Sequence, residues 1–106
     1  MKMRDYAALA WEKAQQEKVR LSHHAQQERL AENISTEDLV VALKNGREVE
    51  AYPDDPRGPS ALLAGQDSQG RWIHVVCGNF EQEYLLVITV YLPQSPKWQD
   101  PFTRGR

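Results

Sequence analysis

The sequence has one cysteine, no long apolar segment and no excess of positive charge. Its single cysteine, Cys77, leaves no partner for an intramolecular disulfide, and a zinc site would depend on histidines and carboxylates. No apolar run approaches the roughly 20 residues of a membrane-spanning helix. The first residues also lead into no signal-peptide core. We therefore expect a cytoplasmic protein that is not bound to a membrane.

The charge balance limits the ways in which this chain can hold a polyanion. Thirteen Lys and Arg residues face fifteen Asp and Glu residues, which gives a formal net charge of −2. A protein that grips long nucleic acid neutralises many phosphates, and this balance is unfavourable for that. The stretch 97–106 is locally basic, with three basic residues and one acid. Any phosphate site is therefore expected to be local and small.

The chain of 106 residues is long enough for one domain with one modest core. We predict a single domain over residues 1–106, with a helical part over 1–45, an antiparallel sheet over 46–93 and a C-terminal tail over 94–106. Residues 19–21 are expected to form a short extended link between two helices.

Three helices are predicted in the first part. Frequent Ala and Gln, with no Gly or Pro, indicate a helix over residues 3–18. Ser22 is placed to cap a second helix that runs to about Asn33. Ser35, followed by acidic residues, is placed to cap a third helix, which Asn45-Gly46 would end.

The pattern changes to period two after the third helix. Four strands are predicted, at residues 47–52, 60–65, 72–77 and 84–91. Helices followed by a four-stranded meander indicate the α+β class, with the helices packed on a mainly antiparallel sheet.

The two strongest strands carry the residues of greatest chemical interest. Alternation places His74 opposite to Ile73 and Val75. In the next strand, alternation assigns one face to Leu85, Val87, Thr89 and Tyr91. A hairpin joining the two strands would bring His74, Thr89 and Tyr91 onto one floor of the sheet. The three side chains at that place suit proton-transfer chemistry. The alternative is that they only pack as part of the sheet.

Several short motifs recur in a fixed order along residues 18–104. They are Ser22-His23-His24-Ala25, Ile34-Ser35 before an acidic helix start, Asn45-Gly46, Glu50-Ala51-Tyr52-Pro53, Arg71-Trp72-Ile73-His74-Val75-Val76, Thr89-Val90-Tyr91-Leu92-Pro93 and Trp98. In this ordered set the chain resembles the "domain of unknown function 4258" family of small bacterial, toxin-like proteins. The resemblance implies the compact α+β fold of RelE-, MqsR- and barnase-type ribonucleases.

The resemblance also implies a function. It is that of a metal-independent endoribonuclease toxin of a type II toxin–antitoxin pair, cleaving RNA or ribosome-bound mRNA by attack of the 2′-hydroxyl. A zinc-finger antitoxin is the implied protein partner, and no cofactor is implied. His24 matches the family's histidine. The family's arginines, four and eight residues further on, are replaced here by Glu28 and Glu32, and Arg29 is displaced by one position, about 100° around the helix.

RNA cleavage without a metal requires a base, an acid and a cation for the transition state. The catalytic candidates are His24, His74, Thr89 and Tyr91, with histidine favoured because its pKa lies near neutrality. The phosphate- or RNA-binding candidates are Arg29, Arg71, Lys97 and Arg104. No metal site is expected, because His23 and His24 are adjacent and diverge on a helix. The structural alternative for each candidate is packing or a solvated surface position.

Two other functions are compatible with the sequence. A non-catalytic relative of the toxin fold, or a protein-interaction module, is favoured by the acidic balance and by Glu28 and Glu32. A homodimer formed by pairing of edge strands fits either function, although the charged, proline-flanked segment 47–52 has the character of a protected edge.

Overall fold

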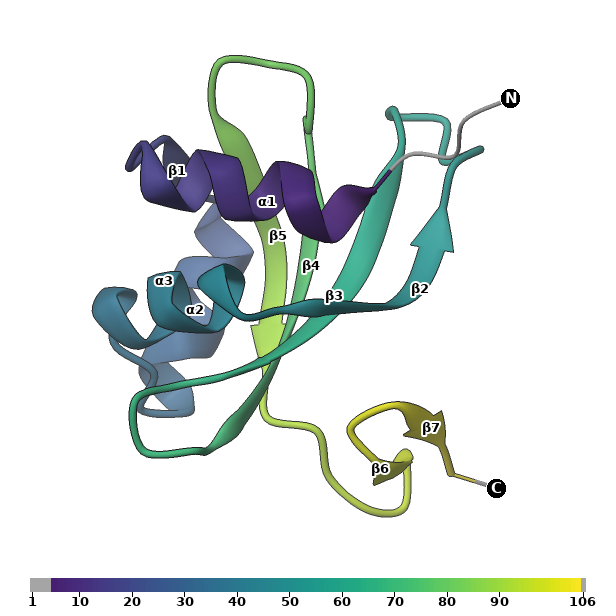
Figure 1. Cartoon of the computed structure of the whole chain (residues 1–106). Helices are drawn as coiled ribbons and strands as arrows, with labels where there is room; N and C mark the ends of the chain where they lie inside the picture. Colours follow the sequence, from purple (N-terminus) through teal and green to yellow (C-terminus); the bar gives the residue numbers. More distant parts are fainter. Residues whose placement is uncertain (1–4, 106) are drawn as a thin grey trace.

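Three helices lie on one face of a five-stranded sheet in the computed structural model, and a short hairpin lies against the other face (Figure 1). The structure describes residues 5–105. The helices are α1 (Tyr6–Gln15), α2 (His23–Ala31) and α3 (Thr36–Lys44). The strands are β1 (Val19–Leu21), β2 (Arg47–Tyr52), β3 (Ser60–Gln66), β4 (Trp72–Gly78), β5 (Leu85–Tyr91), β6 (Trp98–Asp100) and β7 (Thr103–Arg104). The predicted α+β class is confirmed.

The helix caps follow from local side-chain chemistry. The Ser22 hydroxyl accepts a hydrogen bond from the backbone N–H of Ala25 at 3.0 Å, as an N-cap serine does. Ser35 caps α3 in the same way. Helix α2 stops at Ala31, two residues short of its predicted end, and Asn33 has a left-handed φ of 58° that is incompatible with continuing it.

The first helix is shorter than predicted. It was expected over residues 3–18 and is found at Tyr6–Gln15, with Asp5 as its N-cap. Residues 3 and 4 lie outside the described residues. At the other end the chain leaves the helix through Glu17, which has a φ of 57°.

The sheet has one strand more than the predicted meander. Its order is β1-β5-β4-β3-β2, and β1 runs parallel to β5, with Val19 opposite Leu85 and Leu21 opposite Val87. The prediction of an extended link at residues 19–21 was therefore incomplete. A segment of three residues is too short to show a period, and its partner strand lies far along the chain.

A bulge in β5 overturns the predicted alternation along that strand. Thr89 pairs with Val76 and Val87 pairs with Cys77, so Ile88 is an extra residue without a partner in β4. An extra residue reverses the faces on either side of it. Simple alternation could not reveal this, because the bulge depends on the register with β4.

The alternate residues Leu85, Val87, Thr89 and Tyr91 consequently do not share one face of β5. Leu85 and Val87 are fully buried in the core beneath the helices. Thr89 and Tyr91 pair with residues of β4 on the opposite face, where Tyr91 lies across from His74. The prediction that His74, Thr89 and Tyr91 share a floor is confirmed, although the strand reaches that arrangement by a bulge.

The main core lies between the helices and the sheet. Its largest fully buried side chains include Ile34, Leu39, Leu43, Leu63, Ile73 and Val75. Helix α3 approaches β3 so closely that a Cβ on Gly65 would lie 2.0 Å from the Ala42 carbonyl oxygen. Only glycine fits at that contact.

The C-terminal segment is more ordered than the irregular tail that was predicted. β6 and β7 form a hairpin, and the Gly105 N–H donates to the Lys97 carbonyl oxygen at 2.8 Å. Trp98 is only 2 % exposed, and Leu62, on the outer face of the sheet, is also 2 % exposed. Arg106 lies outside the described residues.

Within residues 5–105, the structure contains no helix with the length and apolarity needed to cross a membrane.

Candidate functional site

His74 is enclosed between the sheet and the C-terminal hairpin. Its side chain is fully buried, with Nδ1 3.0 Å from the Tyr91 hydroxyl and Nε2 2.7 Å from the Pro101 carbonyl oxygen. The Trp98 indole N–H donates to the same Tyr91 hydroxyl at 3.2 Å. The rings of His74 and Trp98 meet edge to face, with centroids 4.5 Å apart.

These contacts determine the protonation of the imidazole. A carbonyl oxygen only accepts, so Nε2 carries the proton and donates to Pro101. Nδ1 then accepts from the Tyr91 hydroxyl, which in turn accepts from Trp98. Every polar atom of the network is satisfied with His74 neutral, which is the arrangement that a buried polar group requires.

The pKa values agree with a neutral, enclosed pair. Burial is the main cause that lowers the pKa of His74 below its ordinary value of 6.5, against the opposing effect of the bond to Pro101. Burial also raises the pKa of the Tyr91 phenol. Although His74 lies beside Tyr91 as predicted, these contacts are those of a structural histidine.

Arg104 links the hairpin to β2, an edge strand of the sheet. Its Nε and NH2 groups donate to the two carboxylate oxygens of Glu50, at 2.7 and 2.9 Å, and its guanidinium lies over the Trp98 ring. The hydrogen bond from Arg104 lowers the pKa of Glu50 to about 2. A guanidinium held in this bidentate pair is committed to the fold.

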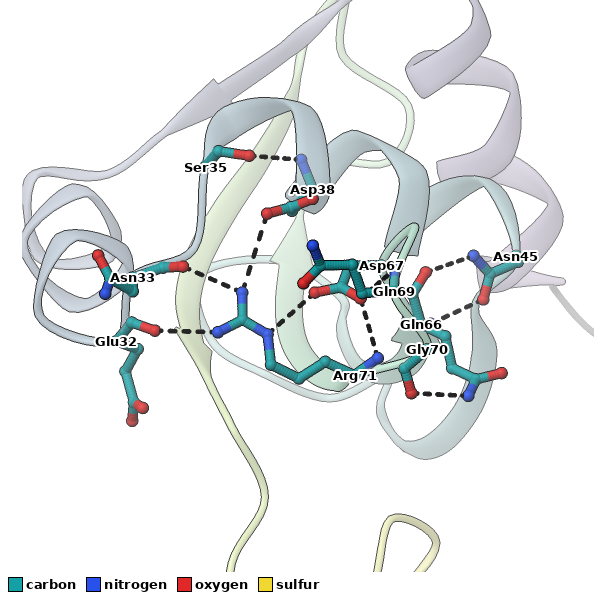
Figure 2. Close-up of polar contacts among 10 residues, drawn as sticks. All are labelled: Glu32, Asn33, Ser35, Asp38, Asn45, Gln66, Asp67, Gln69, Gly70 and Arg71. Carbon is teal, nitrogen blue, oxygen red and sulfur yellow. Dashed lines mark hydrogen bonds and ion pairs between the residues drawn. The ribbon is translucent and has the colours of Figure 1, made fainter.

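Arg71 joins three segments of the chain (Figure 2). Its Nε donates to Asp67 at 2.9 Å, while NH1 and NH2 donate to the carbonyl oxygens of Glu32 and Asn33. NH2 also lies 3.8 Å from a carboxylate oxygen of Asp38. Arg71 therefore connects the turn between β3 and β4 to the end of α2 and the start of α3.

The contacts of Arg71 also account for the lowered pKa of the Asp67 carboxylate. Burial opposes ionisation of Asp67, but the hydrogen bonds that Arg71 and Gln69 donate hold its pKa below the ordinary value. Arg29 is engaged nearby, where it donates to Gln26 and to the Ile34 carbonyl oxygen. Three of the four predicted phosphate ligands, Arg29, Arg71 and Arg104, thus hold protein groups.

Beyond the end of β1, the N-cap and one side chain of α2 form hydrogen bonds with the edge of β5. The Ser22 hydroxyl donates to the Ile88 carbonyl oxygen at 2.9 Å, and the Val90 N–H donates to the Glu28 carboxylate at 3.0 Å. These bonds satisfy strand groups that β1 is too short to reach. Glu28 thereby has a definite role at a position where the resemblance implied arginine.

His24 lies one helical turn before Glu28, on the same side of α2. Its Nε2 is 3.2 Å from the second carboxylate oxygen of Glu28, with the His24 side chain 65 % exposed and that of Glu28 25 % exposed. The contact is an ion-pair approach of the carboxylate to one ring nitrogen, and Nδ1 is the other nitrogen of the ring. Within residues 5–105 no hydrogen bond engages either ring nitrogen of His24, and with this exposure the ring is accessible from solvent.

Lys97 supplies a cation near the same stretch of β5. Its ammonium lies 5.5 Å from the centroid of the Tyr91 ring, and no described acidic side chain forms an ion pair with it. Tyr91 is also within the electrostatic influence of Glu28, which raises the pKa of the phenol. Tyr91 therefore lies between the end of α2 and the start of the hairpin.

The structure brings some of the predicted residues together and separates others. Tyr91 contacts both His74 and Lys97. His24 contacts Glu28, and no contact in the described part of the chain joins it to Thr89, Tyr91 or Lys97. Sequence reasoning did not assign a role to Glu28, although its spacing of four residues from His24 is a signal for a helical pair. Residues 5–105 contain no cluster of three or more His, Cys, Asp or Glu side chains that could hold a metal ion.

Comparison with known protein families gives a match over most of the sheet and two of the helices. The model of a family described as "Domain of unknown function (DUF4258)" matches residues 21–92, which is more than half of the chain. The matched segment begins just before α2 and ends just after β5, so it contains His24, Glu28, His74 and Tyr91 but not the hairpin. No curated protein and no solved structure matches the chain.

Proposed function

Because the chain belongs to the domain of unknown function 4258 family, we propose that it is a metal-independent endoribonuclease that acts at the outer edge of β5. The observation that carries the proposal is the exposed contact of His24 with Glu28, 3.2 Å between Nε2 and a carboxylate oxygen. A carboxylate on one imidazole nitrogen orients the ring and stabilises the imidazolium that forms when the other nitrogen takes a proton.

The proposed reaction uses groups that the fold leaves available. Nδ1 of His24 removes the proton of a ribose 2′-hydroxyl, and the 2′-oxygen attacks the adjacent phosphorus. The bond from phosphorus to the 5′-oxygen breaks, and the Lys97 ammonium or solvent protonates the leaving oxygen. Lys97 also stabilises the negative charge of the transition state, and the Thr89 hydroxyl donates to a phosphate oxygen.

His74 has no proton-transfer step in this mechanism. Its two ring nitrogens already serve Tyr91 and Pro101, and its side chain is fully buried. We assign it the task of holding Tyr91 and the hairpin that carries Lys97. In this proposal His24 touches the substrate, whereas His74 supports the surface that binds it.

The test is cleavage of a fluorogenic mixed-sequence RNA by purified protein in the presence of EDTA. We expect His24→Ala to lower kcat by at least 100-fold, in line with the loss of a general base. Glu28→Gln preserves an acceptor for the Val90 N–H and is expected to lower kcat with little change in KM. His23→Ala is the matched control, because His23 is the adjacent exposed histidine of the same helix.

Two results would overturn this function. One is cleavage by His24→Ala at the wild-type rate, and the other is the absence of cleavage of any RNA by the wild-type protein. The proposed biological setting is a toxin–antitoxin pair, for which a neighbouring gene with a CxxC…CxxC pattern is the supporting observation. Expression of the wild-type chain and of His24→Ala, with and without that gene, tests toxicity directly.

A second function is favoured by one specific observation. The guanidinium groups of Arg29, Arg71 and Arg104 are all occupied by groups of the protein. A relative of the toxin fold that binds a partner without cutting RNA would show this pattern. Stable binding of the neighbouring gene's product by a chain that cleaves no RNA would support this alternative.

A further inference from the structure

Two hollows adjoin on the outer face of the sheet, at the end of β5 that pairs with β1. The first, of about 390 Å³, is lined by Arg20, Tyr84 and Glu83, and the second, of about 260 Å³, by Ser22, Ile88 and Gly58. Asn79 and Leu86 line both hollows, so the two hollows are neighbours. None of these residues has a part in the reaction proposed above.

The first hollow carries a flat cationic platform. The Arg20 guanidinium lies over the Tyr84 ring, 4.0 Å from its centroid, and no described acidic side chain forms an ion pair with Arg20. Both a guanidinium plane and a tyrosine ring are surfaces on which nucleobases stack. Glu83 is the acid of this hollow, and the Lys13 ammonium lies beside it, 2.9 Å from the Glu83 carbonyl oxygen.

The second hollow has an apolar floor and a polar rim. Leu86, Ile88 and Gly78 form the floor, and a Cβ on Gly78 would lie 3.1 Å from Cδ1 of Ile88. Asp55 is the acid of the rim, and its carboxylate is already paired with Arg57 and bonded to the Ser60 hydroxyl. A flat heterocycle would thus meet apolar side chains without facing an uncompensated carboxylate.

Asn79 stands between the two hollows with its amide available. It is exposed, has a left-handed φ of 57°, and its side-chain amide forms no hydrogen bond with the residues described. An amide offers both a donor and an acceptor, which is the pairing needed to read the edge of a nucleobase.

We propose that the two hollows bind two successive nucleotides of single-stranded RNA. One base stacks on the Arg20–Tyr84 platform, and the next enters the hollow floored by Leu86 and Ile88, where Asn79 contacts its edge. This inference rests on the proposed ribonuclease function, for which it names the substrate as single-stranded and assigns a base-recognition subsite.

The position of the second hollow connects it to the proposed catalytic pair. Ser22 lines this hollow and caps α2, two residues before His24. Ile88 lines it as well and precedes Thr89 on the same strand. A strand of RNA that fills both hollows therefore leads its following phosphate toward His24 and Thr89.

The experiment measures binding with a probe that cannot be cleaved. Fluorescein-labelled 2′-O-methyl hexanucleotides of U, C, A and purine-rich mixed sequence lack the nucleophilic hydroxyl, so anisotropy reports affinity alone. We expect Tyr84→Ala to weaken binding on the order of tenfold, consistent with loss of one stacking platform. Arg20→Gln is expected to weaken binding as well, because it removes the guanidinium plane of the same platform.

Asn79→Asp is the variant for base recognition. Aspartate tolerates a left-handed backbone as asparagine does, so the fold should persist while the amide donors are lost. We expect it to change the ranking of the four probes. Lys44→Gln is the matched control, because it removes one exposed charge from α3 on the opposite layer of the molecule.

Each result decides the proposal. Weakening by Tyr84→Ala and Arg20→Gln but not by Lys44→Gln supports it, whereas equal effects of all three variants, or no binding of any probe by the wild-type chain, overturn it. RNA cleavage is measured separately. Binding in the hollows without cleavage would remove the catalytic function alone, and cleavage that is indifferent to Tyr84, Arg20 and Asn79 would remove the subsite alone.

Discussion

The Nε2 atom of His74 lies 2.7 Å from the carbonyl oxygen of Pro101, a residue that follows it by 27 positions. This one contact joins the middle of the sheet to the turn of the C-terminal hairpin. Because the imidazole is also bonded to Tyr91, the hairpin and β5 share a single buried anchor. The stability of the outer face therefore depends on a histidine that the sequence presented as a catalytic candidate.

Replacing His74 tests that anchor. His74→Ala leaves the Pro101 carbonyl and the Tyr91 hydroxyl without their partner and opens a void, so we expect a loss of about 2–4 kcal/mol in the free energy of unfolding. Urea unfolding followed by circular dichroism measures it, with His23→Ala as the exposed control. A His74→Ala protein as stable as the control would show that the anchor is energetically unimportant.

The same histidine predicts a pH dependence of stability. Burial lowers its pKa in the folded state, while in the unfolded chain it titrates at its ordinary value of 6.5. The unfolded state therefore binds more protons just below pH 6.5, and stability falls as the pH is lowered through that value. Tyr91, Glu50, Arg104 and Lys97 are the ionisable groups that face it.

The pH effect is measured by urea unfolding at pH 7.5 and at intervals down to pH 5. His74→Phe preserves a buried ring without a titrating group, so its stability should lack most of this slope. Parallel curves for the wild-type and His74→Phe proteins would assign the slope to other groups.

Arg71 is predicted to matter for stability and not for cleavage. Arg71→Met removes the donors to Asp67, Glu32 and Asn33 at the junction of α2, α3 and the β3–β4 turn. Loss of a part-buried charge-assisted network is expected to cost about 2–3 kcal/mol. Arg57→Lys is the control, because the Arg57 side chain is 79 % exposed and a lysine keeps its charge, so unfolding should be unchanged. Reduced RNA cleavage by a folded Arg71→Met protein would instead show that Arg71 takes part in cleavage.

Glu28 offers a direct test of its place at the strand edge. Glu28→Arg introduces the residue type that the resemblance implied, but it leaves the Val90 N–H without an acceptor and removes the partner of His24. We expect a loss of about 1–2 kcal/mol in unfolding free energy. Glu32→Arg makes the same charge change one turn later, and Glu32 contributes its backbone carbonyl to Arg71 in either case. Equal stability of the two variants would contradict the proposed role of Glu28.

Local features were predictable because they depend on nearest neighbours. Ser22 and Ser35 cap helices with their own hydroxyls, and each bonds an N–H only three residues away. The four strands from Arg47 to Tyr91 follow from alternation and turn residues. The floor shared by His74, Thr89 and Tyr91 was also foreseen, since strand pairing of neighbours along the chain is the simplest topology.

Non-local features could not be read in this way. The strand at residues 19–21 exists through its pairing with β5, and the bulge at Ile88 exists through the register of β5 with β4. The roles of His24 and His74 depend on the same distinction. The ring of His24 is exposed and the ring of His74 is buried. Periodicity along a strand or helix does not reveal that difference.

The sequence by itself determined the helix caps, the strands of the meander, the α+β class and the set of residues able to move protons. Only the tertiary structure decided which of them are free to do so. Burial under the hairpin keeps His74 neutral. Glu28 bonds to the edge of β5 and contacts His24. The reason is physical: caps and periods depend on residues a few positions apart, whereas burial and hydrogen-bond partners depend on segments that meet only in the folded chain.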